Sequence, residues 1–140
     1  HISTADPYCP ELRRVLASAA EELGLEHHTR GTYVCTEGPR FETPAEIRMF
    51  RHLGGDLVGM TSVPEVVLAR EAGICYATVA MVTNYAAGIA QGRLSHQEVV
   101  DVMAENAANL RRLLMRAVEM LDVERTCLCH ATPLDPSAVP

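Results

Sequence analysis

The chain has 140 residues, of which 48% are apolar, enough to bury roughly two-thirds of the surface that the unfolded chain exposes, which excludes an intrinsically disordered protein. Eighteen acidic residues against 12 Lys plus Arg give a formal net charge of -6, and basic residues do not cluster with aromatic ones, which argues against a nucleic-acid partner. No apolar run approaches the roughly 20 residues that span a bilayer, so we expect a cytoplasmic protein without a membrane partner.

The first half of the chain alternates helical and extended patterns. Apolar residues three and four positions apart, between a proline and a glycine, predict an amphipathic helix over residues 11–23. β-Favouring residues predict a short strand over 32–36. Thr43–Glu46 supplies a Thr N-cap, a Pro at the first helical position and a Glu at the third, and so predicts a capped helix to about Leu53.

The second half repeats this alternation. The apolar run 57–60 predicts a buried strand, and Ser62–Glu65 has the capping-box pattern that opens another helix. The nearly all-apolar run 74–82 predicts a central strand with both faces covered. A third capping-box pattern at 95–98 precedes an apolar stripe that predicts a helix of about 25 residues, ending near Leu121.

Helices alternating with short apolar strands predict an α/β fold in which helices pack on a largely parallel or mixed sheet. Three strands are fewer than the roughly five or six of a typical sheet, so we expect an upstream segment or a partner to supply the others. Residues 122–140 contain prolines and no apolar periodicity, and we expect a flexible tail there.

The five cysteines are dispersed, which predicts reduced thiols rather than a disulfide framework. Cys127 and Cys129, followed by His130, form a Cys-x-Cys pair that could bind a metal or close a strained disulfide. A structural zinc needs four ligands and only one such pair exists, so we expect two thiols in a loose tail. We predict no metal site, because four histidines have no ligand-like spacing to His96 or to one another. These are His27, His28, His52 and His130.

In open α/β sheets, ligands bind beyond the carboxyl ends of the strands, so three loops are candidate sites. The first, Glu37–Glu42, brings two carboxylates, a guanidinium and an aromatic ring into one turn before a helix. It suits a polar ligand, but it equally fits a solvated loop in which Glu42 interacts with the helix dipole.

The other two loops leave similar alternatives open. Thr61 and Ser62 precede a helix start, which suits an anion or serves only as a cap. Asn84 follows an apolar run and fits either a ligand-binding amide or a turn residue. His96 begins the last helix and fits either a functional imidazole or a surface residue.

Three segments resemble motifs of the trimeric purine nucleoside phosphorylase and methylthioadenosine phosphorylase family: residues 37–46, 59–65 and 83–85. Their order and spacing match over roughly residues 6–121, so the resemblance implies a nucleoside phosphorylase fold over 1–121, ahead of the tail. It also implies a pentosyltransferase that cleaves purine nucleosides with inorganic phosphate as co-substrate, giving free base and ribose 1-phosphate without a metal or redox cofactor.

The resemblance assigns a role to individual residues. It implies that Phe41 packs against the purine and that Met60 lies beside the ribose. It implies that Thr61 binds phosphate and that Asn84 binds the base at N7 and the 6-position and acts in catalysis.

The resemblance also implies an assembly. The resemblance further implies that His96 lies near the 5′ end of the sugar and that Val99, one helical turn later, forms the wall of that pocket. His1 matches a position that reaches into the neighbouring subunit's site, which implies a homotrimer or hexamer.

The substrate class follows from the hydrogen-bond chemistry of Glu42 and Asn84. A 6-oxopurine presents an N1–H donor, which the Glu42 carboxylate can accept, and an O6 acceptor, to which Asn84 can donate. We therefore expect a 6-oxopurine nucleoside phosphorylase of purine salvage. The 5′ substituent stays open, because His96 suits a hydroxyl while residues 64–77 are most similar to the methylthionucleoside branch; S-methyl-5′-thioadenosine phosphorylase is the alternative.

Family members are about twice as long as this chain, so the resemblance covers their carboxy-terminal half. We expect the Gly-rich phosphate loop and further basic phosphate ligands to lie in the amino-terminal half. That half would be missing here because of truncation or proteolysis. Two other hypotheses follow: a non-catalytic purine-binding fragment, and a nucleosidase that uses water in place of phosphate.

Overall fold

In a computed structural model of the protein, the described residues are 2–89, 96–124 and 126–131. The chain divides into two compact units, which we describe one at a time. Unit 1 comprises His1–Thr29, Thr61–Val79 and Arg112–Pro140, and unit 2 comprises Arg30–Met60 and Ala80–Arg111. Within the described ranges, no helix is both long enough and apolar enough to cross a membrane.

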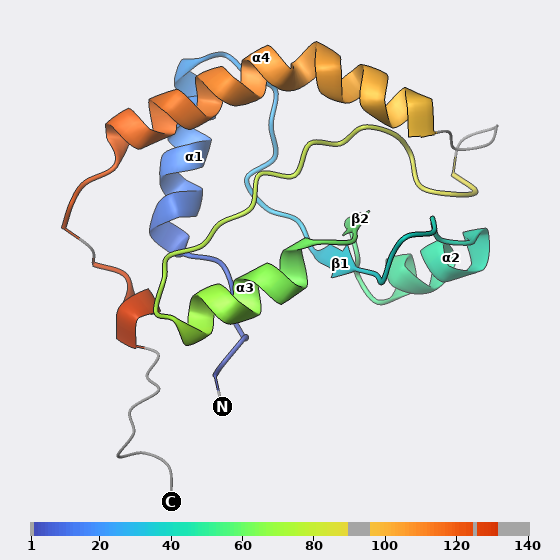
Figure 1. The fold of residues 1–140 in the computed structure, drawn as a ribbon, viewed down its shortest axis with the longest axis horizontal. Helices are drawn as coiled ribbons and strands as arrows, with labels where there is room; N and C mark the ends of the chain where they lie inside the picture. The colour runs from blue at the N-terminus through green and yellow to red at the C-terminus, as the bar shows by residue number, and fades with distance from the viewer. Residues whose placement is uncertain (1, 90–95, 125, 132–140) are drawn as a thin grey trace, which may run out of the picture. The chain divides into compact units, whose positions relative to one another are not determined.

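Unit 2 contains a two-stranded parallel sheet, formed by β1 (Tyr33–Cys35) and β2 (Leu57–Gly59) (Figure 1). The three residues of β1 pair in register with the three of β2. Helix α2 (Pro44–His52) connects the two strands, which gives the crossover that parallel strands require. The α/β class and these three predicted elements are confirmed, each within two residues of its expected ends.

Helix α2 begins where the sequence places its cap. The Thr43 hydroxyl accepts a hydrogen bond from the Glu46 N–H at 3.3 Å, and the Glu46 carboxylate accepts one from the Thr43 N–H at 2.7 Å. Arg40 adds a two-pronged ion pair to the same carboxylate, at 2.7 and 3.0 Å. These donors, led by Arg40, lower the pKa of Glu46 to about 2.

We expect the free energy of unfolding to decrease as the pH falls from about 4.5 toward about 2. Glu46 has a pKa near 4.5 in the unfolded chain and about 2 in the folded one, so protons bind the unfolded state preferentially in this interval. Urea unfolding over a pH series checks this. Glu46→Gln should flatten the dependence and Glu37→Gln should not; an equal slope in the wild type and both variants would contradict the assignment.

Unit 1 contains helices α1 (Pro10–Glu22) and α3 (Ser62–Glu71), the short 3₁₀ helix η1 (Leu128–Ala131), and the end of α4 (His96–Met120). Helix α1 lies against the C-terminal part of α4 (Figure 1). Their contact is made by small and aliphatic side chains: Ala19, Ala20, Leu113 and Ala117. The predicted amphipathic stripe of α1 is confirmed at this contact. In α4 the contact is made by Leu113 and Ala117, whereas Leu114, which the sequence pattern placed on the apolar stripe, is 45% exposed.

The long helix α4 has 25 residues and begins at His96, as the sequence predicts. The predicted cap at Ser95 lies outside the described residues. Over the last part of the helix, Arg116 forms ion pairs with Glu22 of α1 at 2.7 Å and with Glu119 at 3.1 Å. These pairs are exposed and screened by water, so the apolar contact dominates the packing of the two helices.

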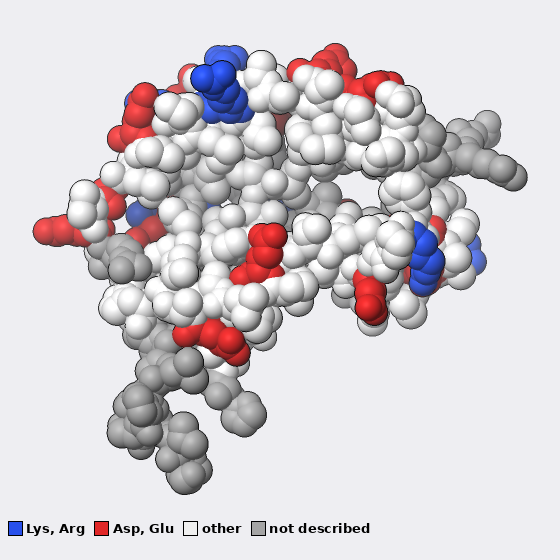
Figure 2. All heavy atoms as spheres, in the orientation of Figure 1, with Lys and Arg blue, Asp and Glu red and all other residues white. Residues whose placement is uncertain are grey.

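Charged side chains on the drawn face of the molecule are dispersed. Figure 2 shows the described Arg side chains in small separate groups, with carboxylates between them. The ion pair between Arg13 and Asp6, at 3.4 Å, is a further exposed example. On this face, the described residues therefore present no broad cationic patch that could follow a phosphate backbone.

The central strand predicted over 74–82 is wrong, because the structure has no strand in this segment. An extended apolar run becomes a strand only where neighbouring strands take up its backbone hydrogen bonds. Here the Tyr76 carbonyl accepts from the Cys9 N–H at 2.8 Å, at the start of α1, rather than from a strand.

The cap predicted at Ser62 is also wrong. Helix α3 begins at Ser62 itself, with Thr61 as its N-cap residue. Ser62 is only 3% exposed, and its hydroxyl lies 2.5 Å from the Tyr8 hydroxyl and 3.1 Å from the Thr78 hydroxyl. A tertiary hydroxyl network therefore replaces the local capping bond.

The two cysteines of the Cys-x-Cys pair are not loose thiols. Cys127 and Cys129 are 6% and 2% exposed, and they pack against Cys9 at the start of α1. The Thr126 N–H donates to the Glu11 carboxylate at 2.9 Å and so holds this segment to α1. Sequence spacing did not indicate this packing, because it joins opposite ends of the chain. The division of the chain at residue 121 stays a prediction.

Candidate functional site

The loop after β1 holds the Glu42 carboxylate at the end of that strand. Thr36, which follows β1, donates its hydroxyl hydrogen to Glu42 at 2.6 Å, and its N–H donates to the Gly59 carbonyl at 2.8 Å. Glu42 is half-buried, whereas Phe41 beside it is 43% exposed. A carboxylate accepts at both oxygens, so the bond to Thr36 positions Glu42 and leaves acceptor capacity for a ligand.

Thr36 is a positioning residue that sequence analysis missed. Its one signal in the sequence is a hydroxyl at the end of a β-favouring run, which many strands share. The bond to Glu42 depends on the path of the intervening loop, and residue spacing does not specify that path.

Met60, at the end of β2, lies over the same loop. Its Sδ is 3.0 Å from the position that a Cβ on Gly38 would take, so a glycine is what allows this close approach. Met60 is half-buried and Thr61 is exposed. Thr61 is the N-cap residue of α3, but its side chain makes no capping hydrogen bond. Its hydroxyl, at the N-terminus of the helix, can therefore donate to a bound anion.

Asn84 is held within its own loop. The Thr83 hydroxyl donates to the Asn84 side-chain oxygen at 2.6 Å, and the Asn84 amide donates to the Tyr85 carbonyl at 3.0 Å. Asn84 is half-buried. Its amide has two hydrogens and only one is used by Tyr85, so a donor remains for a ligand.

Gly88 brings the Asn84 loop against the start of α2. A Cβ on Gly88 would lie 2.7 Å from the Pro44 Cβ, and its φ of 80° is in the left-handed region that favours glycine. Pro44 is two residues after Glu42, so this contact places the two loops side by side within unit 2.

We expect Gly88→Ala to lower the free energy of unfolding by about 1–2 kcal/mol for the left-handed backbone and by about 1–3 kcal/mol more for the collision with Pro44. Urea unfolding measures both losses. Gly24→Ala is the matched control, because Gly24 has a φ of 64° but no atom within 4 Å of its Cβ position. Equal losses in the two variants would contradict the close contact.

The remaining predicted residues are less constrained. His96 is the exposed first residue of α4, and Val99, one turn later, is half-buried. His1 lies outside the described residues. The structure thus ties Phe41, Glu42 and Met60 to one loop region and Asn84 to the loop beside it, while a shared ligand stays a prediction.

A tyrosine–carboxylate pair in unit 1 also escaped sequence analysis. The Tyr76 hydroxyl donates to the Glu65 carboxylate at 2.5 Å, and this bond, with burial, raises the pKa of Tyr76. The Tyr76 ring stacks on Tyr8, with centroids 6.3 Å apart. The pair fixes the segment after α3, which explains why Glu65 does not complete a capping box.

Metal-ligating side chains gather away from these loops. In the part of the chain that the structure describes, the group of three or more His, Cys, Asp or Glu side chains with metal-binding geometry consists of thiols in unit 1. The Glu42 and Asn84 loops are instead suited to hydrogen bonding of a polar organic ligand.

A family model described as the Phosphorylase superfamily matches residues 1–119. A probable 6-oxopurine nucleoside phosphorylase from Moorella thermoacetica is 59% identical over 129 residues, which are 92% of this chain and 50% of that protein. A probable S-methyl-5′-thioinosine phosphorylase from Methanopyrus kandleri is 53% identical over 92% of this chain and 50% of its own length.

Solved structures match as well. A methylthioadenosine phosphorylase sourced from an antarctic soil metagenomic library superposes with a TM-score of 0.85 at 35% identity. The superposition covers 96% of this chain and 48% of that one. The chain spans about half the length of the curated relatives it matches.

Proposed function

Because this chain belongs to the phosphorylase superfamily, we propose that it is part of an enzyme that cleaves 6-oxopurine nucleosides with inorganic phosphate. The products are the free purine base and ribose 1-phosphate. The 59% identity to a probable 6-oxopurine nucleoside phosphorylase is higher than the 51% and 52% identity to two curated S-methyl-5′-thioadenosine phosphorylases over the same number of residues, and it supports this substrate class. The observation that carries the proposal is the Glu42 carboxylate, held half-buried at the end of β1 by Thr36.

Glu42 and Asn84 together select the base. The Glu42 carboxylate accepts from N1–H of hypoxanthine or guanine, and Asn84 donates to O6 or N7. Adenine would place the lone pair of N1 against the carboxylate. A polar group left unpaired in a binding site can cost about 10⁴-fold in discrimination, so this pair alone suffices to disfavour adenine.

The same loops account for the chemistry. Phosphate, held by the Thr61 hydroxyl and backbone N–H groups at the start of α3, attacks C1′ as the glycosidic bond breaks through an oxocarbenium-like transition state. Negative charge develops on the departing purine, and Asn84 stabilises it at N7 and O6. Phe41 packs on the purine and Met60 lies beside the ribose, which fixes the reacting atoms in place.

The 5′ end of the sugar would lie near His96 and Val99. An imidazole hydrogen-bonds a 5′-hydroxyl, whereas a valine favours a methylthio group, so inosine, guanosine and 5′-methylthioinosine are all candidate substrates. S-methyl-5′-thioadenosine is the second candidate, favoured by the likeness to a methylthioadenosine phosphorylase structure.

The complete enzyme would be a cytoplasmic homotrimer or hexamer that acts in purine salvage, with His1 reaching a neighbouring subunit's site. Its reaction would use inorganic phosphate as co-substrate and no metal or redox cofactor. Further phosphate ligands would come from a preceding part of the protein, because this chain spans about half of its relatives.

The test is phosphate-dependent base release by the intact protein that contains this chain. We expect hypoxanthine and ribose 1-phosphate from inosine only when phosphate is present, and faster turnover of inosine or 5′-methylthioinosine than of the matching adenine nucleosides. Chromatography of the bases and enzymatic detection of the sugar phosphate measure both.

Each alternative gives a different result. Base release without phosphate would identify a nucleosidase. Binding of hypoxanthine with no release under any condition would identify a non-catalytic purine-binding protein. Faster cleavage of S-methyl-5′-thioadenosine than of both 6-oxopurine nucleosides would replace the proposed substrate class by the second candidate.

A further inference from the structure

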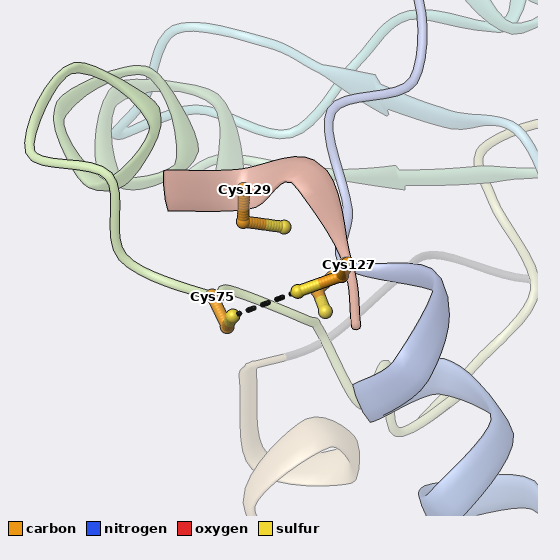
Figure 3. Close-up of side chains that lie close together, drawn as sticks. Cys75, Cys127 and Cys129 are labelled. Atoms are coloured by element: carbon orange, nitrogen blue, oxygen red, sulfur yellow. Dashed lines mark hydrogen bonds between the residues drawn. The ribbon is translucent and has the colours of Figure 1, made fainter. Parts of the chain in front are cut away.

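Four of the five cysteines meet at one place in unit 1. Their sulfur atoms, from Cys9, Cys75, Cys127 and Cys129, all lie within 4.8 Å of one another. Figure 3 shows that Cys75 comes from the segment after α3, while Cys127 comes directly before η1 and Cys129 lies within it. Cys9 is the N-cap residue of α1, so three separate segments converge.

The positions of these thiols are fixed by hydrogen bonds outside the cluster. The Cys9 N–H donates to the Tyr76 carbonyl at 2.8 Å, which joins the first segment to the second. The Thr126 N–H donates to Glu11 in the first turn of α1, which joins the third segment to the first. The cluster is thus built into the fold, as a ligand set must be to bind without large rearrangement.

The spacing of the sulfur atoms matches a tetrahedral metal site. A Zn–S bond of about 2.3 Å places neighbouring sulfurs of a tetrahedron about 3.8 Å apart. The sulfur atoms of Cys75 and Cys127 are 3.4 Å apart, and the others lie within 4.8 Å. Shifts of a few tenths of an ångström, up to about one, convert this arrangement into such a tetrahedron.

Burial of the thiols favours the same occupant. Cys9, Cys129 and Cys127 are 1%, 2% and 6% exposed and Cys75 is half-buried, so water reaches three of the four sulfurs poorly. A structural zinc site is closed in this way, with four protein ligands and no open coordination position. All five cysteines are thiols in the structure.

We propose that Cys9, Cys75, Cys127 and Cys129 bind one zinc ion as a closed four-thiolate site. The proposal goes beyond the phosphorylase activity, because the ion would join the start of α1, the segment after α3 and η1 rather than contact a substrate.

Proton release accompanies binding. Four thiols and one Zn²⁺ give a site with two net negative charges and four free protons, with no change of oxidation state. A metal-bound thiol is deprotonated, so protons compete with zinc for the four sulfurs and binding weakens as the pH falls.

Metal analysis of the intact protein tests the site. The protein is produced in zinc-supplemented medium, purified under reducing conditions without chelator, and analysed by inductively coupled plasma mass spectrometry. We expect about one zinc ion per chain. Cys75→Ser should reduce the zinc content to the background of a zinc-free protein, while Cys35→Ser should retain it, since Cys35 lies in β1 and outside the cluster.

A second measurement applies even where Cys75→Ser does not fold. Wild-type protein stripped of metal is titrated with Co²⁺, and the expected result is the intense visible absorption of tetrahedral cobalt with sulfur ligands. Zinc should then displace cobalt and raise the melting temperature of the stripped protein.

Three results would overturn the proposal. The first is a background zinc content in the wild-type protein together with no tetrahedral cobalt spectrum. The second is an intact mass lower by two hydrogens per bond under non-reducing conditions, which would show disulfides in place of a metal. The third is a zinc content that Cys35→Ser lowers as much as Cys75→Ser does.

Discussion

Replacing Glu42 by alanine is expected to lower kcat/KM for inosine by between about 10²- and 10⁴-fold. The variant leaves the N1–H of the bound purine without its acceptor, which is the costly case for a polar group that binding takes out of water. Adenosine has no hydrogen on N1, so its kcat/KM should stay the same or rise. Steady-state kinetics with both nucleosides measure the ratio, in which effects common to both substrates cancel.

Glu37→Ala is the matched control for this variant. Glu37 lies in the same loop but is exposed, so its loss should leave both rates within about twofold of the wild type. If Glu42→Ala lowers the rates for inosine and adenosine by the same factor, Glu42 supports the loop and does not bind the base.

Asn84→Asp should have the second-largest effect. The change removes an N–H donor from the developing negative charge on the purine and adds a carboxylate there, so kcat for inosine should fall by about 10²–10³-fold. An aspartate can accept from the 6-amino group of adenine, and selectivity should shift toward 6-aminopurine nucleosides. Competition between inosine and adenosine measures the shift directly.

Asn106→Asp provides the control, because it makes the same chemical change in α4, where the Asn106 amide donates to the Val102 carbonyl. We expect unchanged selectivity in that variant. An inosine-to-adenosine ratio that stays at the wild-type value in Asn84→Asp would remove Asn84 from base recognition.

Local signals in the sequence predicted local structure well. The Thr43–Glu46 pattern predicted a helix start, and the structure contains both hydrogen bonds of that capping box. The pattern succeeds because all of its partners lie within one helical turn. The same pattern at Ser62 failed, because its hydroxyl finds buried partners on Tyr8 and Thr78 that residue spacing does not reveal.

Features that depend on distant partners could not be predicted. The run 74–82 has the composition of a central strand, but a strand also needs neighbours, and the structure shows none beside it among the described residues. The Cys-x-Cys pair has no second cysteine pair near it in the sequence that would complete a four-ligand site. The fold nevertheless brings Cys9 and Cys75 to it. Long-range convergence of this kind is a property of the folded chain alone.

The candidate site lies between these cases. The loops after β1 and β2 were predicted from the rule that ligands bind at strand ends, and Glu42 does lie at such an end. The role of Thr36 in holding it was not predictable, because the Thr36 hydroxyl has several possible partners and only the loop path selects one.

A crystal structure of the intact protein with hypoxanthine and phosphate tests the central claim most directly. We expect a Glu42 oxygen within hydrogen-bond distance of N1, about 2.6–3.2 Å, and the Asn84 amide within the same range of O6 or N7. Hypoxanthine bound with Glu42 facing solvent, or with Asn84 away from the purine, would contradict the account.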